Sequence, residues 1–139
     1  MVPNLLLNYP FIKQPKMRIL IADDEPAILM SLDFLMRKEG HQVFVARDGE
    51  EAIQLIEKEL PEVIILDIMM PKVDGYGVCQ QAKTLKADYQ PAVVFISAKI
   101  ADSDIEKGYQ MGADLYIPKP FSNRDLVKKV QELYEKLKN

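Results

Sequence analysis

The chain has 139 residues, of which 48% are hydrophobic and 28% are charged, a composition typical of one soluble globular domain. Its formal net charge of −3 argues against a broad nucleic-acid footprint, because surfaces that bind nucleic acid are usually basic. A single cysteine excludes an internal disulfide. The sequence has no run of about 18 apolar residues, the length that a membrane-spanning helix requires. We therefore expect a cytoplasmic protein in which this domain contacts neither a membrane nor nucleic acid directly.

Residues 1–16 differ in composition from the rest of the chain and contain three prolines. Prolines at this density prevent a long helix or a central strand. We therefore expect an irregular N-terminal leader, followed by a folded domain that spans residues 17–139. An alternative is that the apolar segment Leu5–Leu7, together with Tyr9 and Phe11, covers a hydrophobic surface of the domain or of a neighbouring chain.

From residue 17 onwards the sequence alternates between strand and helix patterns five times. Apolar runs predict strands over residues 18–22, 42–46, 63–67, 92–96 and 113–117. Helical spacing and capping residues predict helices that start at Pro26, Asp48, Gly75, Ser103 and Ser122, with stops at Gly40, Ala87 and Gly112. This alternation predicts an α/β fold, a doubly wound five-stranded parallel sheet in a flavodoxin-like (βα)5 sandwich.

The third predicted strand is an unbroken run of branched apolar residues that ends in Asp67. Such a run suits a strand that is buried on both faces of a parallel sheet. Because ligands bind beyond the carboxyl ends of the strands in open α/β sheets, Asp67 is placed where chemistry occurs. Asp23 and Asp24 follow the first strand, Ser97 ends the fourth, and Lys119 follows the fifth. We expect these five side chains to converge at one edge of the sheet.

The convergence of three carboxylates creates a repulsion that a cation would relieve. At about 4 Å and an effective dielectric constant near 20, each like-charge pair costs on the order of 4 kcal/mol. Oxygen ligands at an open, hydrated edge favour Mg²⁺, which typically takes one or two carboxylates together with a phosphate. With the ion present, Asp67 could act as a nucleophile towards a phosphoryl group, with Lys119 and the Ser97 hydroxyl facing the phosphoryl oxygens. The expected product is an aspartyl phosphate.

A set of short motifs, in order and at family-like spacing, resembles the receiver domains of two-component response regulators, of the chemotaxis-regulator-like kind. The motifs are Asp23-Asp24, Asp67 followed by Met70-Pro71 and Asp74-Gly75, then Ser97-Ala98 and Lys119-Pro120-Phe121. The resemblance extends from residue 17 to about residue 137. It implies a signalling phosphoacceptor that catalyses at most its own phosphoryl transfer and dephosphorylation.

The resemblance implies a role for each acidic residue. Asp67 would accept the phosphoryl group from a histidine of a sensor kinase or phosphotransfer protein, or from a small phosphodonor. Asp24 and Asp67 would bind Mg²⁺ directly, together with the backbone carbonyl of Met69, and Asp23 would bind it through water. The family also implies a cis peptide bond between Lys119 and Pro120.

The resemblance further implies how the domain switches. Ser97 and Lys119 would hold the phosphoryl oxygens. Tyr116 matches the family's switch aromatic, which turns inward when the Ser97 hydroxyl moves towards phosphate, and the small Ala98 leaves room for that movement. The change would be read on the surface formed by the fourth helix, the fifth strand and the fifth helix, roughly residues 102–138.

Three rival interpretations share parts of this pattern. An FMN-binding flavodoxin would have the same architecture, but the acidic residues after the first strand would repel its phosphate. A phosphatase with an aspartyl nucleophile would carry a second acid where this chain has Met69. A receiver-like interaction module that is not phosphorylated stays open. A phosphorylation-dependent homodimer and the identity of the downstream target or output domain also stay open.

Three further residues receive single predictions. Met69 is apolar where many receivers carry a polar residue, so we expect it to hinder the attacking water and to lengthen the life of the phosphoryl group. His41, the only histidine, is expected on the surface away from the active edge. Cys79 is expected to be a small core residue of the third helix.

Overall fold

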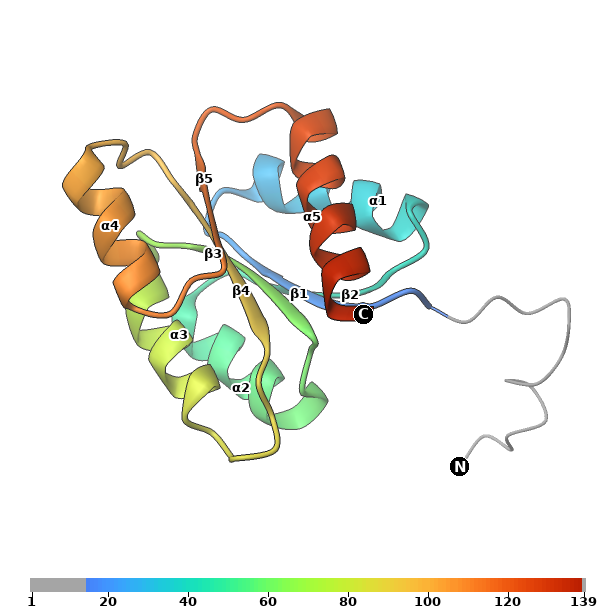
Figure 1. The fold of residues 1–139 in the computed structure, drawn as a ribbon, viewed down its shortest axis with the longest axis horizontal. Helices are drawn as coiled ribbons and strands as arrows, with labels where there is room; N and C mark the ends of the chain where they lie inside the picture. The colour runs from blue at the N-terminus through green and yellow to red at the C-terminus, as the bar shows by residue number, and fades with distance from the viewer. Residues whose placement is uncertain (1–14, 139) are drawn as a thin grey trace, which may run out of the picture.

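The computed structural model describes residues 15–138, in which five strands and five helices alternate along the chain (Figure 1). The strands are β1 (Arg18–Ala22), β2 (Gln42–Ala46), β3 (Val63–Asp67), β4 (Ala92–Ser97) and β5 (Leu115–Pro118). The helices are α1 (Pro26–Lys38), α2 (Gly49–Glu59), α3 (Gly75–Lys83), α4 (Asp102–Gln110) and α5 (Asn123–Lys138). None of the helices within the described range is long and apolar enough to cross a membrane.

The predicted leader lies almost entirely outside the described residues, which begin at Pro15. The expected irregular leader, and the alternative that Leu5–Leu7, Tyr9 and Phe11 cover a hydrophobic surface, therefore both stay predictions. At the start of the described chain, the backbone N–H of Lys16 donates a hydrogen bond to the carbonyl of Gly40 at 3.0 Å. The chain thus enters β1 beside the C-terminal end of α1.

The five strands form one parallel sheet in the order β2-β1-β3-β4-β5, which confirms the predicted doubly wound architecture. β3 lies at the centre, and all of its residues are buried. This position explains why its sequence is apolar without interruption up to Asp67. From β1 the chain first moves outward to β2 and then returns to β3 on the other side. Loops at the ends of β1 and β3 therefore diverge and leave a crevice at the carboxyl edge of the sheet.

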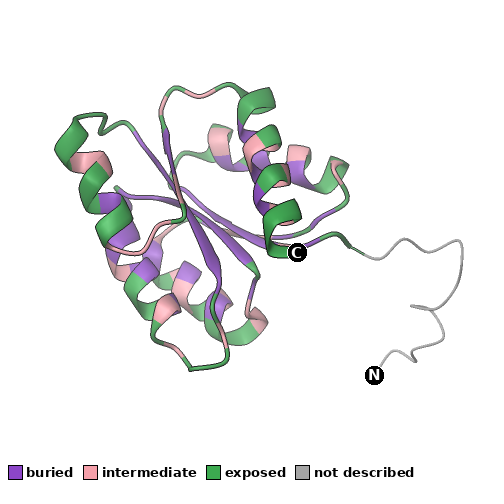
Figure 2. Cartoon of the chain, in the orientation of Figure 1, coloured by how far each residue is buried: buried purple, intermediate pink, exposed green. Residues whose placement is uncertain are grey.

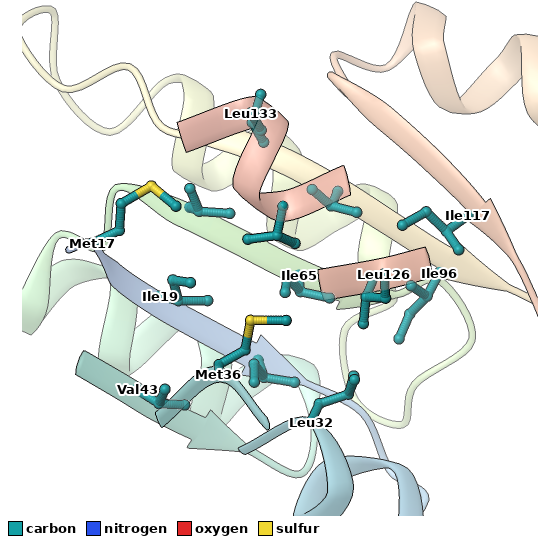
Figure 3. Packing of buried hydrophobic residues seen from close by; sticks show 14 of the residues in the cluster. Met17, Ile19, Leu32, Met36, Val43, Ile65, Ile96, Ile117, Leu126 and Leu133 are labelled. Carbon is teal, nitrogen blue, oxygen red and sulfur yellow. The ribbon is translucent and has the colours of Figure 1, made fainter. Parts of the chain in front are cut away.

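Helices cover both faces of the sheet, with α1 and α5 on one face and α2, α3 and α4 on the other (Figure 1). Alternate strand residues point to opposite faces, so Ile19 and Ile65 pack with Leu32 of α1 and Leu133 of α5 (Figure 3). Burial is concentrated in the strands and in the helix sides that face them (Figure 2). The packed sheet is therefore a firm frame for the polar residues at the strand ends.

Several helix ends follow the predicted local signals. The side chains of Asp48 and Ser122 each accept a hydrogen bond from the backbone N–H three residues further on, at 2.8 and 2.9 Å. Gly40 and Gly112, after the ends of α1 and α4, have φ angles of +95° and +111°. Most side chains disfavour that backbone region, which explains why glycine stands at these stops.

α3 is shorter than the sequence predicts, because it ends at Lys83 rather than at Ala87. The Thr84 hydroxyl donates a hydrogen bond to the carbonyl of Gln80 at 2.8 Å, at the point where the helix stops. Lys83 Nζ donates to the carbonyl of Pro91 at 2.7 Å. The Thr84 bond closes the last turn of the helix, and the Lys83 bond ties the helix end to the segment that leads into β4.

α4 begins at Asp102, one residue before the predicted cap at Ser103. Ala101 occupies the N-cap position and makes no side-chain hydrogen bond, so the predicted capping box at Ser103 is wrong. The first turn instead carries the carboxylates of Asp102 and Asp104, which interact favourably with the helix dipole. β5 likewise begins two residues later than predicted, at Leu115.

His41 is buried, with 6% of its surface exposed, so the prediction that it lies on the surface is wrong. Its ring lies edge-on to the ring of Tyr134 from α5, with centroids 6.4 Å apart. Burial lowers the pKa of His41, and the positive charge of Lys16 lowers it further. Cys79 is fully buried in α3, as predicted.

Candidate functional site

The carboxyl edge of the sheet brings together the polar side chains that end its strands. Asp23 and Asp24 directly follow β1, Asp67 is the last residue of β3, Ser97 is the last residue of β4, and Lys119 follows β5. Asp23, Asp67 and Ser97 are buried, whereas Asp24 is exposed. The five residues that sequence analysis singled out therefore meet at one place, partly sheltered from solvent.

Three carboxylates at this edge could share one cation. Asp23, Asp24 and Asp67 each offer an oxygen, and these oxygens lie within 4.8 Å of one another. Asp23 Oδ1 accepts a hydrogen bond from the backbone N–H of Glu25 at 2.9 Å. Asp23 Oδ2 is buried and accepts no hydrogen bond from any described residue, although Lys119 Nζ lies 3.1 Å away as an ion-pair partner. The candidate ligands are all carboxylate oxygens, and one of them, Asp23 Oδ2, is buried without accepting a hydrogen bond. Such a set of ligands fits a hard divalent cation.

Lys119 is the positive centre of the site. Its Nζ lies 3.1 Å from Asp23 Oδ2 and 3.5 Å from both Asp67 Oδ2 and Glu25 Oε1. Its backbone N–H donates to the carbonyl of Ser97 at 2.7 Å, which fixes the chain that carries the ammonium group. Burial lowers the pKa of Lys119, but the surrounding carboxylates, Asp23 first, raise it more, and the net shift is upward. Glu25 follows β1 together with Asp23 and Asp24, but sequence analysis gave it no role as a partner of Lys119.

The surroundings of Asp67 make its carboxyl group costly to ionise. Burial raises the pKa of its carboxyl group to about 6, and the negative charge of Asp23 adds to the shift. Lys119 and a hydrogen bond at 3.3 Å from the backbone N–H of Met69 act in the opposite direction but do not cancel it. Burial also raises the pKa of Asp23. A cation at this edge would therefore stabilise carboxylates that are otherwise costly to ionise.

The loop after β3 is shaped by two glycines that allow very close backbone contacts. A Cβ on Gly75 would lie 2.6 Å from the carbonyl oxygen of Asp67, and one on Gly49 would overlap the carbonyl oxygen of Val73. Gly49 N–H also donates to the carbonyl of Pro71 at 3.3 Å. The glycine of the Asp74-Gly75 motif thus has a steric reason, and the start of α2 supports the loop from behind.

A chain of hydrogen bonds leads from Ser97 to Tyr116. Ser97 Oγ accepts a hydrogen bond from the backbone N–H of Lys99 at 3.1 Å, and the Tyr116 hydroxyl donates to the carbonyl of Lys99 at 2.7 Å. Tyr116 is 7% exposed, so its ring points inward. The peptide bond between Lys119 and Pro120 is cis, as the resemblance predicted.

An apolar groove of about 490 Å³ opens beside Lys119, between α1 and the loop that joins β5 to α5. Ile28, Ala98, Pro120 and Phe121 provide much of its lining, which also includes Lys119. Sequence analysis did not predict this groove, because it forms only when α1 and the segment after β5 come together. The groove joins the acidic edge directly.

A match to a family model shows which protein family carries this site. The family model described as "Response regulator receiver domain" matches residues 19–131. The chain belongs to the response regulator receiver domain family. The resemblance stated from the motifs is therefore confirmed, and this receiver domain is a member of the two-component signalling proteins.

Relatives of this receiver domain include longer proteins. The chain is 39% identical over 131 residues to the probable transcriptional regulator ycf27 of Guillardia theta. The match covers 94% of this chain but 50% of that relative, so the chain spans about half the length of the regulator that it matches.

Solved receiver domains share its fold closely. The receiver domain of the Francisella response regulator 1452 has a TM-score of 0.80 at 30% identity, over 87% of this chain and 98% of that one. A CheX–CheY–BeF3–Mg²⁺ complex from Borrelia burgdorferi contains a chain with a TM-score of 0.76 at 27% identity, over 84% of this chain and 87% of that one.

Proposed function

We propose that Asp67 accepts a phosphoryl group in a Mg²⁺-dependent reaction and that the domain thereby switches its surface. The supporting observation is the position of the Asp67 carboxylate, which is buried at the end of the central strand, 3.5 Å from Lys119 Nζ and grouped with two further acids. A phosphoryl group needs positive neighbours for its equatorial oxygens and a nucleophile in line, and this edge supplies both.

The donor set suits Mg²⁺ bound at the acidic edge. Asp24, Asp67 and the backbone carbonyl of Met69 would hold the ion directly, and Asp23 would hold it through water. The bound ion would supply positive charge that offsets the repulsion among the carboxylates and the incoming phosphate. The related Borrelia complex, which contains both BeF3 and Mg²⁺, supports this assignment.

The transfer itself is carried by residues of this chain and by the donor. An Asp67 carboxylate oxygen forms a bond to phosphorus while the bond between phosphorus and the donor's imidazole nitrogen breaks, and the electron pair leaves with that nitrogen. Lys119 and the Ser97 hydroxyl would donate hydrogen bonds to the phosphoryl oxygens as negative charge gathers there. The product is an aspartyl phosphate on Asp67.

The donor would be a histidine-bearing protein, either a sensor kinase or a phosphotransfer protein. The apolar groove beside Lys119 supports a protein donor, because it is continuous with the acceptor edge and lined by Ile28 and Phe121. An apolar segment of the donor lying in this groove would bring its phosphohistidine towards Asp67. A small phosphodonor would need no groove and serves as the simpler chemical test.

The output of the switch would be a changed surface on α4, β5 and α5. Phosphorylation adds about −1.5 to −2 charges, and the hydrogen bonds from Ser97 through Lys99 to Tyr116 give a route from the edge to that surface. By analogy with the ycf27 relative, the domain would serve transcriptional regulation in the cytoplasm, with DNA contacts made by another part of the system. Phosphorylation-dependent pairing of two copies is the assembly that we propose for this surface.

Mass spectrometry of the intact chain tests the proposed function. Incubation with Mg²⁺ and acetyl phosphate should add one phosphoryl group, and EDTA should prevent the addition. Asp67→Asn should abolish labelling, whereas Asp88→Asn, an exposed acid before β4, should label like the native chain. Labelling of Asp67→Asn to the native extent, or calorimetry that detects no Mg²⁺ uptake, would overturn the proposal.

The labelling experiment and a separate test of flavin uptake distinguish the remaining alternatives. A receiver-like module that is not phosphorylated would bind partners without ever gaining the phosphoryl mass. An FMN binder would take up flavin, which the cluster Asp23, Asp24 and Glu25 opposes, because three carboxylates would face the flavin phosphate.

A further inference from the structure

The middle of α4 approaches the sheet so closely that a side chain at residue 108 does not fit. Gly108 is the buried residue of α4. A Cβ at this position would lie 2.6 Å from Cδ2 and 2.9 Å from Cε2 of Tyr116, and 3.3 Å from Cδ2 of Phe95. Real Cβ atoms essentially never show contacts under 3.0 Å. A side chain at residue 108 would therefore force either the Tyr116 ring or α4 to move.

The Tyr116 ring is held in this space from several sides. Its hydroxyl donates to the carbonyl of Lys99 at 2.7 Å, and its backbone N–H donates to the Tyr109 hydroxyl at 3.2 Å. The ring lies edge-on to Phe95, with centroids 6.5 Å apart. A flexible side chain could shift slightly to accommodate a new methyl group. The Tyr116 ring is held by its hydroxyl, by its backbone and by Phe95, so it could accommodate the methyl group only by moving out of this space.

The position of this ring is linked to the acceptor edge through a single residue. The Lys99 backbone receives the Tyr116 hydroxyl at its carbonyl and donates its N–H to Ser97 Oγ at 3.1 Å. A movement of the Ser97 hydroxyl towards a phosphoryl group would act on the same residue that anchors Tyr116. The space over Gly108 is where that anchored ring must fit.

We propose that Gly108 is a positioning residue of the switch, because its missing side chain reserves the space that Tyr116 occupies when its hydroxyl is bonded to Lys99. The link to Asp67 rests on the phosphoacceptor function proposed above, whereas the steric part does not. Glycine inside a helix is less favourable than alanine, so the stability of α4 alone does not explain Gly108. Its contact with Tyr116 does.

Thermal unfolding of four 139-residue chains tests the steric part: the native chain, Gly108→Ala, Tyr116→Ala and the double variant. We expect Gly108→Ala to lower the Tm in the native background. In the Tyr116→Ala background it should leave the Tm unchanged or raise it, because only the better helix propensity of alanine remains. Ser103→Ala, exposed on the same helix, is the matched control and should shift the Tm equally in both backgrounds. An equal shift for Gly108→Ala in both backgrounds would overturn the proposal.

Fluorine NMR of the 139-residue chain with 3-fluorotyrosine at position 116 tests the link to the acceptor site. Mg²⁺ with BeF3⁻ should move this resonance in the native chain and in Ser103→Ala, but not in Gly108→Ala. Labelling of Asp67 by acetyl phosphate should stay within about twofold of native in Gly108→Ala, because no reacting group is changed. An unaltered fluorine response in Gly108→Ala refutes the positioning role. If the native chain is not labelled, the proposed phosphoacceptor function fails, and the unfolding cycle still decides the steric claim.

Discussion

The two ends of the sheet differ in how well their polar groups are paired. At the amino end, Arg18 pairs with Glu59 at 3.0 Å, and the Tyr89 hydroxyl donates to the carbonyl of Pro61 at 2.6 Å. The buried side-chain atom without a hydrogen-bond partner among the described residues at that end is Nδ1 of His41, and burial lowers the pKa of this ring. At the carboxyl end, the buried atom without a hydrogen bond among the described residues is Oδ2 of the Asp23 carboxylate, which forms an ion pair with Lys119 and has further acids beside it.

This difference indicates that the polar groups at the amino end stabilise the fold, whereas those at the carboxyl end form the candidate functional site. Partners at the amino end match each other, so folding leaves little charge unbalanced there. Like charges at the carboxyl end oppose folding in the metal-free chain, and Lys119 balances only part of them. Such an arrangement is expected where a ligand completes the site. Each prediction below acts on one end and leaves the other unchanged.

The largest effect is expected from Asp67→Asn in metal-free solution. The pKa of Asp67 is raised from 3.8 to about 6, so the folded state holds this proton more tightly than the unfolded state. The resulting stability is present below about pH 4 and is lost as the pH rises through 6. The variant should therefore match the native chain near pH 4 and exceed it by on the order of 3 kcal/mol at pH 8. Urea unfolding in EDTA across this range measures the difference; a constant difference would contradict the prediction.

Mg²⁺ should stabilise the native chain by a comparable amount. An ion that binds only the folded state adds about 2.7 kcal/mol at a hundredfold excess over its Kd. Thermal unfolding with and without Mg²⁺ should show a clear rise in Tm, most of which Asp24→Asn removes. Asp114→Asn, which alters an acid paired with Lys83 at the other end, should retain the full Mg²⁺ response. Equal responses of the two variants would argue against a cation at the carboxyl edge.

Tyr89→Phe should break the amino end alone. The change removes the hydroxyl that donates to the Pro61 carbonyl, and a hydrogen bond of this kind contributes about 1 kcal/mol. Unfolding in urea should show that loss, while labelling by acetyl phosphate should proceed at the native rate. Slower labelling would mean that the two ends are more tightly coupled than their separate contacts indicate.

The smallest effect is expected for Met69→Asn. The Met69 side chain is 59% exposed and lines a recess with Asp24 and Lys99. An apolar group there should obstruct the water that attacks the aspartyl phosphate. The asparagine should speed dephosphorylation about threefold, which corresponds to about 0.6 kcal/mol in the barrier. Decay of the phosphorylated mass over time measures the rate, and a rate equal to native would refute the idea.

Much of this receiver domain could be predicted because its signals are local. Apolar runs that stop at polar residues indicate both the strands and the edge where their ends meet. Other features depend on residues far apart in the sequence. His41 is buried by Tyr134 of α5, and Glu25 pairs with Lys119, from which it is separated by 94 positions. Gly108 weakens a helix when considered locally, and its purpose becomes visible only when Tyr116 lies against it.

Gly49, at the start of α2, affects how the proposed cation site could be lost during evolution. The backbone at Gly49 abuts Val73 and holds Pro71 from behind, so the bend that presents Met69 acquires its shape during folding. At the proposed Mg²⁺ site, the ion would therefore bind to a backbone that already has its shape. A related protein with a larger residue at position 49 could retain Asp23, Asp24 and Asp67 and still bind Mg²⁺ weakly, because the larger residue would displace the loop. The acidic residues and the loop shape can therefore be lost independently in evolution, and a motif search would detect only the loss of the acidic residues.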